Sequence, residues 1–220
     1  MAFVRFLLPL AFFLALISAA HAAIENPGFE KGDLTGWTVE KYYSGSATVV
    51  SQYLADDEDD LGPDVITPYG PMEGLYFALL RADGVEKWTT VKQSFGVVMG
   101  DILSGWAAFD YQDYDPYIDK AQVRILDGSG TEIAIPWNLS GPAAFWDGPW
   151  TKWSWTSTVT GPITLEYRVA DWVDSTYDSY ALFDDTTVNE VPEPTGLLVW
   201  SGLGVLAWVA ARKRKPAKAA

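Results

Sequence analysis

The chain contains no cysteine, and its one histidine is His21. The absence of cysteine excludes thiol catalysis and thiolate-bound zinc. His21 lies in an N-terminal segment that we expect to be removed, so the mature chain would also lack histidine-dependent triads and histidine metal ligands. Oxygen ligands are then all that the chain can offer a metal ion, and they favour hard cations such as calcium.

Positive charge is also scarce. The chain has 15 basic and 29 acidic residues and a formal net charge of −14 at pH 7. The region between residues 23 and 195 holds nine of the basic residues and all 29 acidic ones, a formal charge of −20. Such a surface repels phosphates and attracts cations, so no nucleic-acid partner is expected.

The first 22 residues have the pattern of a secretory signal peptide. Arg5 precedes an apolar run over residues 6–17, and Ala20, His21 and Ala22 form an A-x-A cleavage sequence. The run is too short to span a bilayer comfortably, because a span takes ~20 apolar residues. We predict that signal peptidase cuts after Ala22; the alternative is an uncleaved N-terminal anchor.

The other end of the chain is apolar as well. Residues 196–211 carry no charge, and a basic cluster follows at once, made of Arg212, Lys213, Arg214 and Lys215. A 16-residue helix is ~24 Å long, slightly short of a ~30 Å hydrocarbon core, and flanking cations can compensate for the difference. We predict a single transmembrane helix at 196–211 and a basic cytoplasmic tail at 212–220, which leaves residues 23–189 outside the cytoplasm.

The region between the two ends has the pattern of an all-β domain. In the clearest segment, residues 163–169, Ile163, Leu165, Tyr167 and Val169 face one way, whereas Thr164, Glu166 and Arg168 face the other. The turn sequence at 127–130 (D-G-S-G) predicts a hairpin. The expected strands are 37–43, 47–54, 74–82, 88–98, 101–112, 122–126, 131–137, 150–157, 163–169 and 180–188. With no convincing amphipathic helix, they predict a jelly-roll β-sandwich ectodomain over residues 23–189.

The C-terminal region also contains a recognisable motif. Residues 190–195 form a short linker that includes Val191, Pro192, Glu193 and Pro194. This V-P-E-P sequence, followed by the short apolar segment and the basic cluster, resembles the PEP-CTERM sorting signal. The resemblance implies that an exosortase recognises and processes the protein in a Gram-negative bacterium that makes exopolysaccharide. The product would then reach the cell surface or the extracellular matrix.

The two ends of the ectodomain carry a second resemblance. The opening N-P-G-F-E-K-G-D-L-T-G-W (26–37) and the closing S-Y-A-L-F-D-D-T-T-V (179–188) are similar to those of galactose-binding-like and carbohydrate-binding jelly rolls. The resemblance implies a structural calcium ion held by Glu30 and Asp184, with Asp185 as a further candidate ligand. Two carboxylates brought together would repel unless a cation lay between them. The alternative is a solvated turn and an ordinary surface aspartate pair.

Two inner segments are also notable. Residues 171–179 (D-W-V-D-S-T-Y-D-S) resemble a segment of exported PEP-CTERM domains, except that Val173 stands where the pattern has glycine. Four aspartates alternate with tyrosines between residues 110 and 119, and such a segment would either bind cations or sugar hydroxyls or form an ordered loop. The aspartates are Asp110, Asp113, Asp115 and Asp119.

Tryptophan is abundant, with 11 in the chain. Sugar rings stack their C–H faces on exposed tryptophan, and Trp146 and Trp150 lie in a Gly/Pro-rich loop at 141–150 where they could do so. Trp37, Trp153 and Trp155 fit core-facing strand positions instead. The sequence predicts a non-catalytic surface protein that binds or is embedded in exopolysaccharide. The alternatives are a purely structural or adhesive protein and, third, a glycoside hydrolase that uses two carboxylates.

Overall fold

The computed structural model describes residues 23–56, 66–113, 115–141 and 148–189. The predicted signal peptide, sorting motif, transmembrane helix and basic cluster lie outside these ranges, as does Trp146. Within the described ranges, no helix has the length and apolarity needed to cross a membrane.

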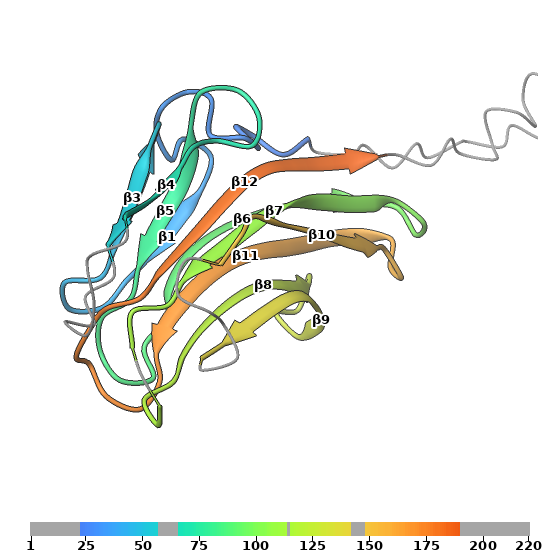
Figure 1. Ribbon diagram of the computed structural model, residues 1–220. Coiled ribbons are helices and arrows are strands. Elements are labelled where there is room, and N and C mark those ends of the chain that lie inside the picture. Colours follow the sequence, from blue (N-terminus) through green and yellow to red (C-terminus); the bar gives the residue numbers. More distant parts are fainter. Residues whose placement is uncertain (1–22, 57–65, 114, 142–147, 190–220) are drawn as a thin grey trace, which may run out of the picture.

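The described residues form two five-stranded antiparallel sheets and one hairpin (Figure 1). The first, the β11 sheet, has the order β1 (Thr38–Glu40), β6 (Thr89–Val97), β11 (Gly161–Asp171), β8 (Asp119–Asp127) and β9 (Glu132–Ser140). The second, the β12 sheet, has the order β10 (Thr151–Thr156), β7 (Ile102–Asp110), β12 (Tyr180–Asn189), β5 (Phe77–Arg81) and β2 (Ser46–Val50). The chain passes repeatedly between the sheets, as in a jelly roll, so the predicted all-β sandwich is confirmed.

The hairpin was not predicted. It pairs β3 (Tyr53–Asp56) with β4 (Ile66–Tyr69). The single strand predicted at 47–54 covers parts of both β2 and β3, and no strand was predicted at β4. Pro68 lies within β4, and proline in a short run argues against a strand except at an edge.

The core lies between the sheets. Ile163, Leu165, Tyr167 and Val169 are fully buried, as the alternation in 163–169 predicted. Aromatic rings form its centre: the Tyr167 and Phe183 rings stack with their centroids 4.4 Å apart. Trp37 and Trp153 belong to the same core, and their predicted burial is confirmed.

A second, smaller core covers part of the outer face of the β12 sheet. Ala55 and Tyr69 from the hairpin pack on Phe77, Ala108 and Leu182. The hairpin therefore occupies apolar positions that the β12 sheet would otherwise expose. The outer face of the β11 sheet carries polar side chains instead.

Candidate functional site

Two rows of polar side chains cross the outer face of the β11 sheet. In one row Arg168 of β11 stands opposite Gln122 of β8, and Gln122 stands opposite Asn138 of β9. In the other row Glu166 of β11 stands opposite Arg124 of β8. The rows exist because β-strand side chains alternate between faces, so the residues between the core positions of β11 and β8 share the outer face.

The Glu166–Arg124 pair is the more rigid part of these rows. Arg124 Nε and Nη2 lie 2.7 and 2.5 Å from Glu166 Oε2. The Glu166 side chain is only 5% exposed and that of Arg124 is 25% exposed. Charge-assisted hydrogen bonds of this kind fix both side chains in one orientation.

Arg168 is held from two sides. Its Nε donates to Gln122 Oε1 at 2.9 Å, and its guanidinium carbon lies 4.0 Å from the centroid of the Trp88 ring. Burial, helped by the nearby charge of Arg124, lowers the pKa of Arg168 to about 10. The guanidinium therefore stays charged at neutral pH and can donate hydrogen bonds from a fixed position.

These side chains line a cleft of about 240 Å³ at the β1 side of the sheet. Two aromatic rings, Tyr42 and Trp88, contribute to its wall. The other lining residues are mostly charged and balanced in sign, and they are Glu40, Glu86, Lys87, Thr90, Arg124, Glu166 and Arg168. The cleft is thus close to neutral, in contrast to the acidic chain as a whole.

A second tryptophan extends the aromatic part of this surface. The Trp172 ring centroid lies 6.1 Å from that of Trp88, and Lys120 Nζ lies 3.2 Å from the Trp172 ring centroid. Trp88 precedes β6 and Trp172 follows β11, and these strands are neighbours in the sheet. Both rings are partly exposed.

Of the two tryptophans proposed from sequence, Trp150 lies away from this cleft, and Trp146 is outside the described residues. Trp150 is half-buried on the outer face of the β12 sheet, where its ring edge contacts Tyr69 and Phe77. Its Nε1 donates to the Gly70 carbonyl oxygen at 3.1 Å. These contacts give Trp150 a packing role, and sugar stacking on it stays a prediction, as it does for Trp146.

The predicted calcium ligands Glu30 and Asp184 are brought to one loop. Asp184 Oδ2 accepts hydrogen bonds from the backbone N–H groups of Met72 and Glu73, at 2.7 and 3.1 Å. Glu30 accepts from the next N–H groups of the same loop, with Leu75 N 2.9 Å from Oε2. The two carboxylates thus anchor residues 72–76 against the start of the domain.

This arrangement suits a hard cation in its donor chemistry. A Cβ added at Gly28 would lie 3.8 Å from Glu30 Cγ and 3.9 Å from Asp184 Oδ1, so Gly28 keeps space open between the two side chains. Burial raises the pKa of Asp184 to about 6, and it also raises the pKa of Asp185. Backbone N–H groups already donate hydrogen bonds to the carboxylates of Glu30 and Asp184. Calcium binding by Glu30, Asp184 and Asp185 stays a prediction.

The aspartates between residues 110 and 119 are structural in part. Asp110, Asp113 and Asp119 are almost fully buried. Tyr53 Oη donates to Asp110 Oδ2 at 2.5 Å, and Ser179 Oγ donates to Asp119 Oδ2 at 2.6 Å. These bonds favour the ordered-loop interpretation over a sugar-binding surface.

No protein-family model matches the chain, and no curated protein matches it. Several solved structures are similar in fold. One is TmCBM61 in complex with β-1,4-galactotriose, which matches over 76% of this chain and 97% of its own (16% identity, TM-score 0.48). The CBM22-1 xylan-binding domain of Paenibacillus barcinonensis Xyn10C matches over 75% of this chain and 93% of its own (15% identity, TM-score 0.41). The enzymatically active domain of Bacteriophage CBA120 tailspike protein 4 matches over 76% of this chain and 21% of its own (13% identity, TM-score 0.44).

The cleft on the β11 sheet was not predicted from the sequence, because it combines a ring just before a strand with charged residues inside the strands, whereas the prediction considered exposed rings in a loop. Sugar stacking on Trp146 and Trp150 stays a prediction. One signal was available: Glu166 and Arg168 both occupy the face of 163–169 opposite the core. Charged residues at successive outward positions of a strand indicate a polar outer face of the sheet, on which side chains can pair.

Proposed function

We propose that this protein is an exported, non-catalytic glycan-binding module, and that the cleft on the β11 sheet is its binding site. The observation that supports this most directly is the combination of Trp88 with the fixed guanidinium of Arg168 in one cleft. A sugar ring has an apolar C–H face and a rim of hydroxyls. Arg168 covers one face of the Trp88 ring, so a sugar would contact the remaining ring surface together with the oriented donors and acceptors around it.

The charge of the cleft indicates what kind of glycan fits. Its lining has three carboxylates and three cations, so a neutral or weakly charged glycan would meet no net repulsion. Glu166, Arg124 and Arg168 present acceptors and donors whose orientations are set by their partners. Preorganised groups of this kind bind with a smaller loss of side-chain entropy.

The export and sorting of the protein belong to the same proposal and rest on the sequence alone. A signal peptide at 1–22, the motif Val191 to Pro194 and a membrane segment at 196–211 would deliver the sandwich to the outside of the cell. Signal peptidase and an exosortase are the expected processing partners. The extracellular glycan met there would be the exopolysaccharide of the producing cell.

The test is a binding measurement on the full chain in detergent micelles. Exopolysaccharide from the producing cells, and a panel of neutral oligosaccharides, would be titrated against the wild type, Trp88→Ala, Trp150→Ala and Trp106→Ala. Trp106 is a matched control because it is a half-buried tryptophan on the other sheet, beneath Lys152.

Saturable binding that Trp88→Ala weakens and Trp106→Ala preserves would support the proposal. Saturable binding that instead requires Trp150 would move the site to the other sheet. Absence of saturable binding to every glycan would contradict the proposal and favour the structural or adhesive alternative. Release of reducing ends from the polysaccharide would contradict the non-catalytic assignment.

A further inference from the structure

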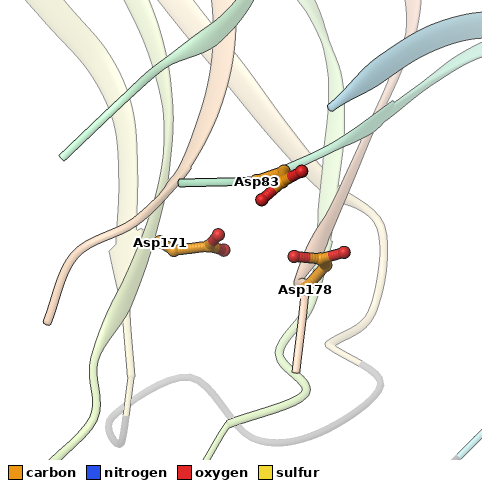
Figure 2. A group of neighbouring side chains, drawn as sticks. All are labelled: Asp83, Asp171 and Asp178. Carbon is orange, nitrogen blue, oxygen red and sulfur yellow. The ribbon is translucent and has the colours of Figure 1, made fainter. Parts of the chain in front are cut away.

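Three aspartates from separate parts of the chain converge at one end of the sandwich (Figure 2). Asp83 lies just after β5, Asp171 ends β11, and Asp178 lies just before β12. One carboxylate oxygen from each lies within 4.8 Å of the others. Like charges at this separation repel strongly unless something positive is shared between them.

The protein's own donors satisfy this cluster only in part. Asp83 Oδ2 accepts from Ser44 N at 2.6 Å, and Asp171 Oδ2 accepts from Gly84 N at 3.0 Å. Asp171 is only 1% exposed, yet its Oδ1 has no hydrogen-bond partner. Figure 2 shows the Asp171 carboxylate pointing toward Asp83 and Asp178. A buried carboxylate oxygen without a partner is costly and indicates a missing ligand.

The charges in the cluster also do not balance. Arg81 forms an ion pair with Asp178 and supplies one positive charge against three carboxylates. The excess of two negative charges equals the charge of one divalent ion. Burial, with the added charges of Asp119 and Asp178, raises the pKa of Asp171 to about 8. Without a metal, a proton on Asp171 would relieve part of the repulsion near neutral pH.

We propose that Asp83, Asp171 and Asp178 bind a calcium ion. Calcium takes oxygen ligands at ~2.3–2.6 Å, so oxygens on opposite sides of the ion are separated by ~4.6–5.2 Å. Magnesium, with bonds of ~2.0–2.1 Å, would need opposite oxygens within ~4.2 Å and near-ideal octahedral geometry. Separations of up to 4.8 Å lie within the range for calcium, and water and carbonyl oxygens would complete its coordination.

This site differs from the one predicted at Glu30 and Asp184, and it has a structural consequence. The ion would join the segment after β5 to the segment between β11 and β12. Those two segments also carry Trp88 and Trp172, whose rings are in contact range. Calcium would therefore fix the relative position of the two tryptophans. The metal site itself does not depend on the proposed glycan function.

The experiment is a calorimetric titration of the full chain in detergent micelles, after removal of metal with EDTA, using calcium chloride and magnesium chloride. The wild type is compared with Asp171→Asn, Asp178→Asn and the control Asp174→Asn. Asp174 lies in the same connection and carries the same charge, but it is outside the trio. Asp184→Asn is included to account for calcium bound at the other candidate site.

We expect Asp171→Asn and Asp178→Asn each to lose one equivalent of bound calcium that Asp174→Asn and Asp184→Asn retain. Magnesium should bind at this site more weakly than calcium. Equal calcium stoichiometry in the wild type and both trio variants would overturn the proposal. Failure of the wild type to bind calcium, or loss of all its calcium in Asp184→Asn alone, would also overturn it.

Thermal unfolding shows whether a variant that fails to bind calcium is still folded. In EDTA, Asp171→Asn should unfold at a temperature equal to or above that of the wild type, because it removes repulsion and its amide oxygen can still accept from Gly84 N. Added calcium should raise the unfolding temperature of the wild type and much less that of Asp171→Asn. An equal rise in both proteins would contradict the proposal.

Discussion

Arg168 lies over the Trp88 ring, with its guanidinium carbon 4.0 Å from the ring centroid, while its Nε donates to Gln122 Oε1 at 2.9 Å. The aromatic ring thus positions the guanidinium, and the guanidinium in turn restrains the ring. A ligand that used one of these groups would meet the other in a defined place.

Removal of the Trp88 ring should weaken glycan binding strongly. Truncation of a central aromatic anchor typically costs ~2 kcal/mol or more of binding free energy, which corresponds to a loss of affinity of roughly 30-fold. Trp88→Phe should retain part of the affinity, because a smaller ring remains. Affinity would be measured by calorimetry with the best-binding oligosaccharide. An unchanged dissociation constant for Trp88→Ala would exclude this ring from the site.

The Glu166–Arg124 pair should contribute to stability through its burial. Removal of one partner from a buried ion pair typically costs ~3–5 kcal/mol, and we expect a lower value of about 2–3 kcal/mol for Arg124→Ala because Arg124 is 25% exposed. The double variant Arg124→Leu/Glu166→Leu should recover much of that loss, since no buried unpaired charge remains. Glu132, the other partner of Arg124, is 43% exposed. Urea unfolding of the two variants and the wild type would measure both effects.

A pair of glycine variants separates side-chain overlap from backbone strain. Gly74 has φ +65°, and a Cβ there would overlap the Glu30 carboxylate. Gly130 has φ +84°, and nothing lies within 4 Å of a Cβ built there. Gly130→Ala should cost ~1 kcal/mol from the unfavourable φ alone.

Gly74→Ala should therefore destabilise the protein more than Gly130→Ala does, as measured by chemical denaturation. It should also weaken any calcium binding that involves Glu30. Equal destabilisation by the two substitutions would mean that the Glu30 carboxylate is not held against the loop at residues 72–76.

Metal-free protein should lose stability as the pH rises toward neutrality. Burial raises the pKa of Asp119 to about 7, with a further contribution from Asp113, whereas an unfolded aspartate titrates near ~3.9. Between these values the folded state binds more protons than the unfolded state, so the free energy of unfolding decreases as pH increases from about 4 to about 7.

Asp119→Asn should reduce the slope of that decrease in EDTA. Asp171 and Asp184 also have raised pKa values, about 8 and about 6, so part of the slope should persist. Unfolding free energies of the wild type and Asp119→Asn, measured at several pH values, would give both slopes. A slope that is identical in the variant and the wild type would contradict the assignment to Asp119.

Calcium should strengthen glycan binding if both proposals hold. The ion would immobilise the segments that carry Trp88 and Trp172 before the ligand arrives, and this lowers the entropic cost of binding. The effect should disappear in Asp171→Asn and persist in Asp174→Asn. Glycan affinity that does not change with calcium in the wild type would separate the two sites functionally.

The sequence predicted the sandwich well because its strands follow simple rules. Segment 163–169 alternates cleanly, and its four apolar residues are all buried. The turn at Asp127 was also predicted from its local sequence. In the structure, Asp127 Oδ1 accepts hydrogen bonds from Ser129 N and Thr131 N, at 2.8 and 2.9 Å. Local rules of this kind need no knowledge of the tertiary fold.

The sites were less predictable because they depend on the pairing of distant strands. Asp83, Asp171 and Asp178 meet only because the ends of β5 and β11 lie close to the start of β12, and no local pattern shows this. The opposition of Arg168 to Gln122 depends on the β8–β11 register. By contrast, a resemblance supplied the long-range information that relates Glu30 to Asp184. Both carboxylates accept hydrogen bonds from the loop at residues 72–76, and calcium binding by them stays a prediction.

The direction of β12 bears on how far the binding surface stands from the cell. β12 begins at Tyr180, close to the aspartate trio, and ends nine residues later at Asn189, the last described residue (Figure 1). A strand of that length spans ~30 Å. If the chain is tethered through its C-terminal end, the tryptophan pair would lie roughly the length of this strand from the point where the tether begins. The strand would then act as a spacer between the tether and the tryptophan pair.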